Sequence, residues 1–318
     1  MFLGQQWNLR TNVDLGFMNT FSECIQQVET KNPNLLPNLR RGSTIMVASD
    51  CSGQHSQAFY ESLTFLLADL EACGIWEEKR QILRKTFLSD NRRMSYKNLN
   101  DKKRRQALTS FLSAANTIPG VVITVLIDKK ISSLFRKTGS LDMDDSELQA
   151  YKHWNRKTFE KLLRIIHMVS FFIAGLSRSS QNILWITDED EIVPNKEKLR
   201  EAVQLFANIS SHYLSHNLGK FQWGTTKSDN GTRQIEDLVA IPDLIAGSLS
   251  HVLSDYEKQG IFPSRQLILS PSNSLPEKVM KIMNWFSDDT QPLKRLVFSI
   301  RLEENSTSLI LDNLRFIA

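Results

Sequence analysis

The sequence predicts an α/β protein whose sheet contains parallel strand pairs. Short runs of β-branched and apolar residues alternate with longer segments of helical periodicity, as in sheets whose strands are joined through helices. Three of these apolar runs end at an aspartate, and strand carboxyl ends form the ligand-binding edge of open α/β sheets. The 318 residues are 41% hydrophobic and 23% charged, which excludes a disordered or fibrous protein.

The first part of the chain leads into the predicted sheet. Residues 1–42 are mixed and polar, and we expect them to form an arm or a short helix that packs on the domain. Thr44–Asp50 has the composition of a buried strand and precedes turn residues. Ala58–Ala68 is predicted as a second, weaker strand or as the start of a helix, and Trp76–Leu88 is predicted as a helix.

The middle of the chain repeats the alternation of helix and strand. The expected elements are a helix from Asn100 or Asp101 to Thr117, a strand over Val121–Asp128, a helix over Asn155–Ala174 that Gly175 ends, and a strand over Asn182–Asp188. The strand over Val121–Asp128 is the clearest, because eight consecutive positions carry it and it ends in a carboxylate.

The last part of the chain adds helices and a C-terminal pair of strands. The expected elements are a helix capped by Asn195, a short strand over Phe221–Gly224, a helix that Pro242 opens and Gly260 ends, and strands over Arg295–Arg301 and Thr307–Leu311. We therefore divide the chain into an arm (1–42), a main domain (43–260) and a C-terminal extension packed on the core (261–318).

Composition and cysteine usage predict a soluble cytoplasmic protein with no membrane partner. The cysteines Cys24, Cys51 and Cys73 have no CxxC spacing and are too few for a disulfide framework. The N-terminal residues lack the apolar run of a signal peptide, and the most apolar segment, Leu162–Leu176, is too short and too charged to span a bilayer.

Acidic residues at the strand ends predict a site for a hard divalent cation. Asp50, Asp128 and Asp188 each end an apolar strand, and Asp243 lies near the start of the helix that Pro242 opens. Clustered carboxylates repel one another unless a cation lies between them, and Mg²⁺ or Mn²⁺ prefers oxygen ligands. Two such ions about 3.5–4 Å apart activate water and stabilise the leaving oxygen in phosphodiester cleavage. Aspartate after a strand is also a common turn former, which is the alternative for each residue.

Five short motifs over residues 43–258 form one set. They are Asp50-Cys51-Ser52-Gly53, Ile127-Asp128-Lys129, Ile186-Thr187-Asp188-Glu189, Gln234-Ile235-Glu236-Asp237 and Pro242-Asp243-Leu244-Ile245-Ala246-Gly247. Together they resemble the domain of unknown function 3800 family of bacteria. The resemblance implies a ribonuclease-H-like mixed sheet flanked by helices, with a C-terminal β extension in this chain.

The same resemblance implies a metal-dependent nuclease site and a role in mobile-element or anti-phage contexts. By analogy, Asp50 bridges the metals, Asp188 is a second ligand, and Asp243 is a third ligand from a helix. The metal ligands are therefore drawn from Asp50, Asp128, Asp188 and Asp243, because Asp128 competes with Asp188 for the middle position.

Two departures from the family pattern leave alternatives open. Cys51 replaces a glutamate of the family, which removes one candidate ligand. Asp237 and Asp243 both fit the last motif; they are six residues apart, or about 240° around a helix, so they cannot share a face of a continuous one. Pro242 predicts a break between them and favours Asp243.

A basic segment is the candidate nucleic-acid contact. Seven cations and one tyrosine fall within 14 residues: Arg92, Arg93, Tyr96, Lys97, Lys102, Lys103, Arg104 and Arg105. A phosphate backbone would bind such cations, and Tyr96 would stack on a base. The alternative is a solvated helix face, and the net charge of +4 does not decide between the two.

The sequence carries two functional hypotheses. Motifs for P-loop, Rossmann and serine-hydrolase sites are missing, which disfavours those chemistries. The first hypothesis is a hydrolase that cleaves DNA or RNA with Mg²⁺ or Mn²⁺ and uses Asp50, Asp188 and Asp243. The second is a catalytically inactive binding or assembly subunit, with a protein partner in a defence complex, which Cys51 favours.

Overall fold

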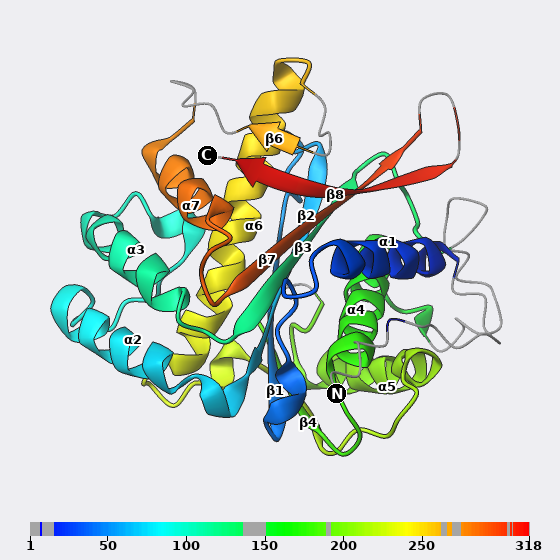
Figure 1. Cartoon of the computed structure of the whole chain (residues 1–318), viewed down its shortest axis with the longest axis horizontal. Helices are drawn as coiled ribbons and strands as arrows, with labels where there is room; N and C mark the ends of the chain where they lie inside the picture. The colour runs from blue at the N-terminus through cyan, green and yellow to red at the C-terminus, as the bar shows by residue number, and fades with distance from the viewer. Residues whose placement is uncertain are drawn as a thin grey trace.

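A computed structural model describes residues 7, 16–135, 151–188, 192–261, 266–268, 275–303, 306 and 308–317. Glu189 of the third motif and Thr307, the predicted start of the last strand, lie outside these ranges. Within them the chain forms one eight-stranded mixed sheet with the order β5-β4-β1-β2-β3-β7-β8-β6. Helices cover both faces of this sheet (Figure 1).

Seven of the strands agree with the sequence-based elements to within two residues at each end, except that β8 continues six residues beyond its predicted end at Leu311; β6 was not predicted. The bounds of the strands are β1 Thr44–Ser52, β2 Tyr60–Asp69, β3 Gly120–Asp128, β4 Asn182–Thr187, β5 Phe221–Thr225, β6 Gln266–Ile268, β7 Lys294–Leu302 and β8 Leu309–Ile317. The segment that was ambiguous between strand and helix, Ala58–Ala68, is the strand β2, and nearly all of its side chains are buried.

The helices are longer at several ends than the sequence predicts. Their bounds are α1 Phe17–Lys31, α2 Gly74–Phe87, α3 Lys102–Ala115, α4 Arg156–Leu176, α5 Lys196–Tyr213, α6 Gln234–Lys258 and α7 Glu277–Ser287. Asp101, Asn155 and Asn195 cap α3, α4 and α5 through their side chains, as the sequence indicated for Asp101 and Asn195.

The order of the first five strands is the ribonuclease-H-like arrangement. β1, β2 and β3 form an antiparallel meander, and β4 and then β5 add in parallel on the other side of β1. The predicted fold class is therefore confirmed. The C-terminal β extension is also confirmed, because β7 pairs in parallel with β3 and β8 pairs with β7.

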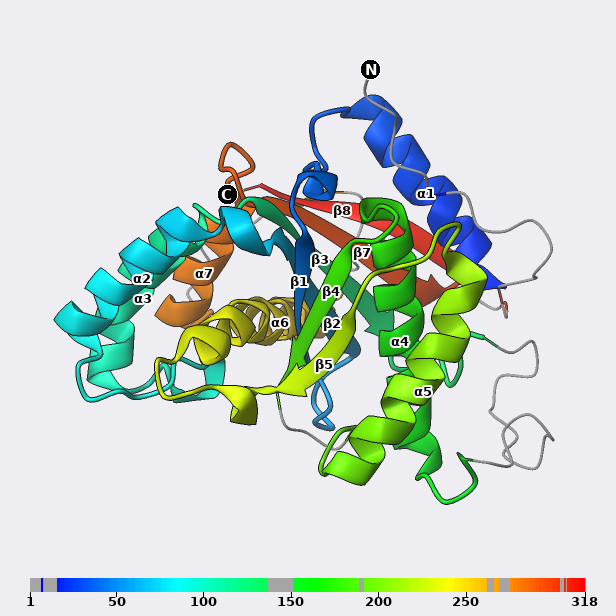
Figure 2. The ribbon, with the colours of Figure 1, turned by 90° about the horizontal axis from the view of Figure 1, so that it is seen from below.

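Two apolar clusters hold the layers together. One lies between the sheet and α1, α4 and α5, and the other lies between the opposite face of the sheet and α2, α3, α6 and α7 (Figure 2). The N-terminal segment contributes to the first cluster, since Phe21 of α1 lies against Phe171 and Phe298 with ring centroids 5.4 and 4.8 Å apart. The predicted arm is thus a helix that is part of the core.

Two predictions about helix ends are wrong. Gly175 lies inside α4 and does not end it; its Cα hydrogens face the Trp7 ring, where a Cβ would meet ring carbon at 2.2 Å. Pro242 lies inside α6, which starts at Gln234 and continues without a break. A proline removes only one backbone donor, and a helix packed as fully as α6 can retain its other hydrogen bonds.

α6 is also the one helix among the described residues that is long and apolar enough to cross a membrane. Of its most apolar stretch, 89% is buried inside the protein between the sheet and α2 and α7. Its composition is therefore that of a core helix, as expected for a soluble protein.

Candidate functional site

The alternation of side chains along β1 directs Asp50 towards α6. Met46 and Ala48 belong to the cluster under α6, whereas Ile45 and Val47 belong to the cluster under α4. Because strand side chains alternate between faces, Asp50 lies on the α6 face.

Cys51 lies on the other face of the sheet. It packs against the cluster under α4, away from the carboxyl group of Asp50. A glutamate at this position would leave the strand from the same face. The replacement of a family glutamate by Cys51 therefore removes no carboxylate from the α6 face, where Asp50 lies.

Asp188 is the neighbour of Asp50 on the adjacent strand. β4 pairs in parallel with β1, and Thr187 is opposite Ser49, so the next residues of the two chains stand at the same level. Adjacent strands lie about 4.8 Å apart. Leu184 and Ile186 pack on the α6 side, which directs Asp188 to the same face as Asp50.

Asp243 reaches the same place from α6. Its carboxyl group is hydrogen-bonded to that of Asp50 and is close to Asp188 and Arg93. Its Oδ2 also accepts a hydrogen bond of 2.7 Å from the backbone N–H of Tyr96, in the 3₁₀ turn η3 (Tyr96–Asn98). Burial raises the pKa of the Asp243 carboxyl above its ordinary value, which favours a proton between Asp243 and Asp50.

Arg93 and Thr226 both hold the Asp188 carboxylate. Arg93 Nη2 lies 2.6 Å from Asp188 Oδ2, and Thr226 Oγ1 donates to Asp188 Oδ1 at 2.8 Å. Arg93 is held in turn through its carbonyl, which accepts from Arg104 Nε at 2.7 Å. The Arg93 guanidinium also interacts favourably with Asp243, so it serves two of the three carboxylates.

Asp128 stands apart from these residues. It is opposite Tyr60 at the end of β2, whereas Asp50 is opposite Thr64 on the other edge of β2. Two strand spacings and four residues of rise separate them by roughly 16 Å. Asp128 Oδ1 accepts from the N–H of Lys130 at 2.9 Å, which is the contact of a turn-forming aspartate.

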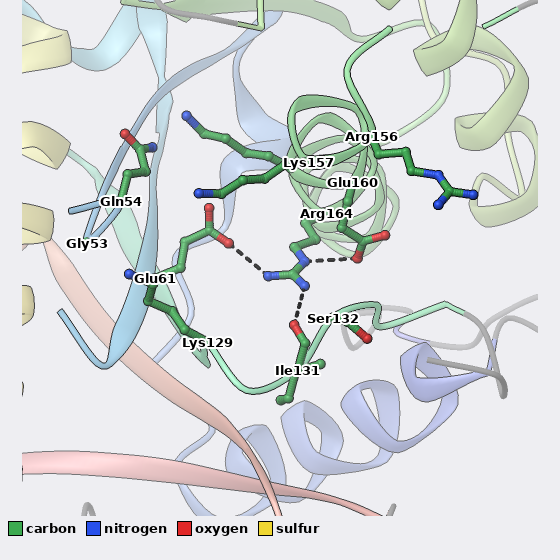
Figure 3. Close-up of a pocket in the computed structure, with 11 residues that line it drawn as sticks. Gly53, Gln54, Glu61, Lys129, Ile131, Ser132, Arg156, Lys157, Glu160 and Arg164 are labelled. Atoms are coloured by element: carbon green, nitrogen blue, oxygen red, sulfur yellow. Dashed lines mark hydrogen bonds and ion pairs between the residues drawn. The ribbon is translucent and has the colours of Figure 1, made fainter. Parts of the chain in front are cut away.

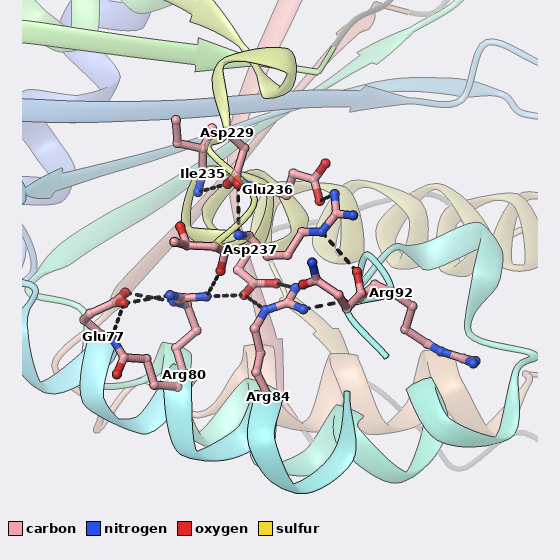
Figure 4. A network of polar contacts seen from close by, with 12 residues as sticks. Glu77, Arg80, Arg84, Arg92, Asp229, Ile235, Glu236 and Asp237 are labelled. Carbon is pink, nitrogen blue, oxygen red and sulfur yellow. Dashed lines mark hydrogen bonds and ion pairs between the residues drawn. The ribbon is translucent and has the colours of Figure 1, made fainter. Parts of the chain in front are cut away.

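Asp237 is part of a separate buried network between α6 and α2. Its Oδ2 lies 2.5 Å from Arg84 Nε and 3.1 Å from Arg80 Nη1, and its side chain is fully buried. Figure 4 shows this network, which Glu77 extends through a 2.6 Å contact with Arg80. Since α6 is continuous, Asp237 and Asp243 point in different directions, and only Asp243 faces β1.

The donor chemistry of Asp50, Asp188 and Asp243 fits Mg²⁺ or Mn²⁺, since all three are carboxylates with hard oxygen atoms and Asp243 interacts with both of the others. Among the described residues, no group of three His, Cys, Asp or Glu side chains is placed to hold a metal ion as it stands. The raised pKa of Asp243 favours a proton between Asp243 and Asp50, and the Arg93 guanidinium pairs with Asp188.

Much of the predicted nucleic-acid segment is engaged within the protein. Arg92 pairs with Asp90 and Asp101 at 2.6 Å each, Lys103 pairs with Asp90 at 2.7 Å, and Arg104 lies 3.7 Å from Asp101. These cations fix the loop that carries Arg93.

Tyr96 is also engaged. A Cβ on Gly247 of α6 would lie 2.3 Å from its ring, Lys278 Nζ lies 4.4 Å from the ring centroid, and its hydroxyl is 3.1 Å from His251 Nδ1. These contacts position the Tyr96 N–H beside Asp243 and do not support the predicted stacking on a base.

Three other cations of the segment are exposed: Lys97, Lys102 and Arg105. Lys102 and Arg105 line a cavity of about 500 Å³ between α3 and α7, together with Lys278 and Lys281. Lys278 lies next to both Tyr96 and Asp243. Asp50, Asp188 and Asp243 do not line this cavity, and Lys278 is the residue that connects it to Asp243.

Sequence reasoning missed two residues of the site. Thr226 follows β5 and Lys278 follows the start of α7, and neither belongs to a motif that points to this chemistry. Only the position of β5 beside β4 and the packing of α7 on α6 bring them here. Arg93 was grouped with nucleic-acid contacts, because a sequence does not show which acid an arginine will meet.

A scan against protein-family models gives no match for this chain, and a search of curated proteins gives none either. The resemblance to the domain of unknown function 3800 family therefore remains a prediction from the five motifs. The ribonuclease-H-like sheet is given by the strand order itself.

Proposed function

We propose that the protein is a metal-dependent phosphodiester hydrolase that acts on DNA or RNA in the cytoplasm. The observation that carries the proposal is the meeting of Asp50, Asp188 and Asp243, from two parallel strands and a helix, at one edge of a ribonuclease-H-like sheet. Carboxylates brought together repel one another, and a divalent cation would take the place of the proton that burial favours between Asp50 and Asp243.

In this proposal Asp50, Asp188 and Asp243 hold Mg²⁺ or Mn²⁺, which supplies an activated water and stabilises the leaving oxygen. Asp128 is not a proposed metal ligand, because the strand register places it away from Asp50. Asp237 is not one either, because it is paired with two buried arginines. The basic cavity between α3 and α7 binds the phosphate backbone. A role in anti-phage defence follows only from the motif resemblance.

The test is a cleavage assay on single- and double-stranded DNA and RNA with Mn²⁺ and with Mg²⁺. We expect cleavage by the wild type and by Asp128→Asn, and none by Asp50→Ala or Asp243→Asn. Asp128→Asn is the matched control, since it also removes a carboxylate from a strand end. Equal cleavage by Asp50→Ala would show that the site is misassigned.

A second function is favoured by the contact between Arg93 and Asp188. A guanidinium 2.6 Å from a carboxylate that must hold the metal can make the site permanently metal-free. The protein would then be a non-catalytic nucleic-acid-binding or assembly subunit, with a protein partner. Binding of nucleic acid in EDTA, without cleavage under any metal condition, would support this alternative over the hydrolase.

A further inference from the structure

A second cavity lies at the same end of β1 but on the α4 face of the sheet. It has a volume of about 340 Å³, within the size range of small-ligand sites. Its walls come from the turn after β1, from β2, from the segment after β3 and from the first turns of α4 (Figure 3). Glu61 of β2 lies on this face, as do its neighbours Leu63 and Phe65. The carboxylates of Asp50 and Asp243 are on the other side of the sheet.

The floor of this cavity is a fixed polar network around Arg164. The guanidinium, which is almost fully buried, contacts Glu61 Oε2 at 2.9 Å, Glu160 Oε1 at 3.0 Å and the carbonyl of Ile131 at 2.8 Å. Glu160 Oε1 also accepts from the N–H of Leu134 at 3.2 Å. These contacts, drawn in part in Figure 3, hold the two carboxylates in place without a ligand.

The remaining groups of the cavity call for an anion and for a hydrogen-bond donor. Five cationic side chains line it against two acidic ones: Lys129, Arg156, Lys157, Lys161 and Arg164 against Glu61 and Glu160. Arg156 and Lys157 are both exposed, but the Arg156 guanidinium points away from the other side chains that line the cavity (Figure 3). Glu160 is only 7% exposed, and its Oε2 has no hydrogen-bond partner among the described residues. A buried acceptor without a donor is costly, so a ligand donor would complete it.

The turn after β1 fixes one wall. Gly53 has a φ of +88°, and a Cβ there would lie 2.1 Å from the carbonyl oxygen of Tyr60, so this close approach requires glycine. Lys129 is also fixed, because its Nζ donates to the carbonyl of His55 at 2.8 Å. The cavity is thus bounded by backbone that neighbouring strands hold in place.

We propose that this cavity binds a small phosphorylated ligand that also carries a hydroxyl or amino donor, as a mononucleotide does. The phosphate lies against Lys157, which lines the cavity from the first turn of α4. The donor of the ligand bonds to Glu160 Oε2. The same chemistry is present in a free nucleotide and in the phosphorylated end of a nucleic-acid strand.

The test is calorimetric titration of the full chain in EDTA with AMP, ribose 5-phosphate, inorganic phosphate and adenosine. We expect AMP and ribose 5-phosphate to bind with a Kd of about 1 mM or lower, and the other two to bind at least about tenfold more weakly. Lys157→Glu is expected to reduce the affinity for AMP by about tenfold or more, whereas the exposed neighbour Lys130→Glu leaves it unchanged.

Two further arms separate this site from the proposed hydrolase. Asp50→Ala should bind AMP as the wild type does, because Asp50 lies on the opposite face of the sheet. If this variant loses cleavage but still binds AMP, the proposal for the cavity stands independently of the hydrolase proposal. Competition by an oligonucleotide with a 5′-phosphate, but not by one with a 5′-hydroxyl, would identify a strand end as the source. Equal affinity of Lys157→Glu and wild type, or no binding of either phosphorylated compound, would overturn the proposal.

Discussion

Arg93 Nη2 lies 2.6 Å from Asp188 Oδ2, so a side chain from the loop between α2 and α3 neutralises the carboxylate that ends β4. Asp188 is adjacent to Asp50 on the sheet, and Asp50 is hydrogen-bonded to Asp243. The guanidinium is therefore the positive charge at the point where the proposed hydrolase needs a divalent ion. If the proposed hydrolase binds a metal, the metal would compete with this ion pair for Asp188.

Arg93→Ala should make the protein less stable without metal and more responsive to it. The three carboxylates would lose their cation, and the free energy of unfolding in EDTA should fall by about 1 kcal/mol, since the pair is partly exposed. Mn²⁺ should then bind more tightly than to the wild type. Thermal unfolding with and without Mn²⁺ measures both effects.

Arg92→Ala is the control for this variant. Arg92 lies in the same loop but pairs with Asp90 and Asp101, away from the carboxylates of the site. Its removal should leave the response to Mn²⁺ at the wild-type level. If Arg93→Ala and Arg92→Ala respond alike, Arg93 does not compete with a metal.

The sequence predicted most of the strands and identified the candidate acids, because both depend on local pattern, but it missed β6, which has only three residues. Apolar runs that end in aspartate identify Asp50 and Asp188, and their side-chain faces follow from alternation once the strand order is known. The sequence could not choose between Asp128 and Asp188, since that choice depends on which strand pairs with β1 in parallel.

The helix motif shows a different limit of sequence reasoning. Pro242 predicted a break that does not occur, because the burial of α6 on both sides outweighs the loss of one backbone donor. The choice of Asp243 over Asp237 was nevertheless the one that the packing favours. The reason lies in the tertiary structure, because Arg80 and Arg84 of α2 form ion pairs with Asp237.

The pH dependence of metal-free stability should identify the proton at Asp243. Burial raises the pKa of this carboxyl, so the folded state binds more protons than the unfolded state between the ordinary pKa and the raised one. Stability should therefore increase as the pH falls from neutral into that window. Four other side chains face the Asp243 carboxyl and determine how far its pKa is raised: Asp50, Asp188, Arg93 and Lys278.

Urea unfolding at several pH values between 7.5 and 5, in EDTA, checks this expectation as a difference between wild type and Asp243→Asn. The variant cannot titrate at this position, so its profile should lack the increase. A wild type that loses stability relative to Asp243→Asn as the pH falls would mean that Arg93 and the Tyr96 N–H outweigh burial.

Asp237→Asn and Asp243→Asn should differ strongly in stability. Asp237 is the carboxylate of two arginines, and its loss leaves buried charge without a partner, which costs about 3–5 kcal/mol. Asp243→Asn removes a carboxyl that burial already disfavours as an anion, and we expect a change of about 1 kcal/mol or less. Denaturant unfolding of the two variants measures the contrast, and similar losses for both would contradict the assignment of Asp237 to structure and Asp243 to the site.

The basic residues of the cavity between α3 and α7 predict how nucleic-acid binding depends on salt concentration. Lys102 and Arg105 are exposed there, and Lys278 connects the cavity to Asp243. If both contact phosphates, the double variant Lys102→Ala/Arg105→Ala should bind DNA or RNA more weakly and should lower the slope of log K against log salt by about 2.

Lys220→Ala is the control, since Lys220 is exposed at the amino end of β5, the opposite edge of the sheet. Fluorescence anisotropy in EDTA across a range of salt concentrations gives both slopes without cleavage. Identical slopes for the double variant and Lys220→Ala would move the nucleic-acid path away from this cavity.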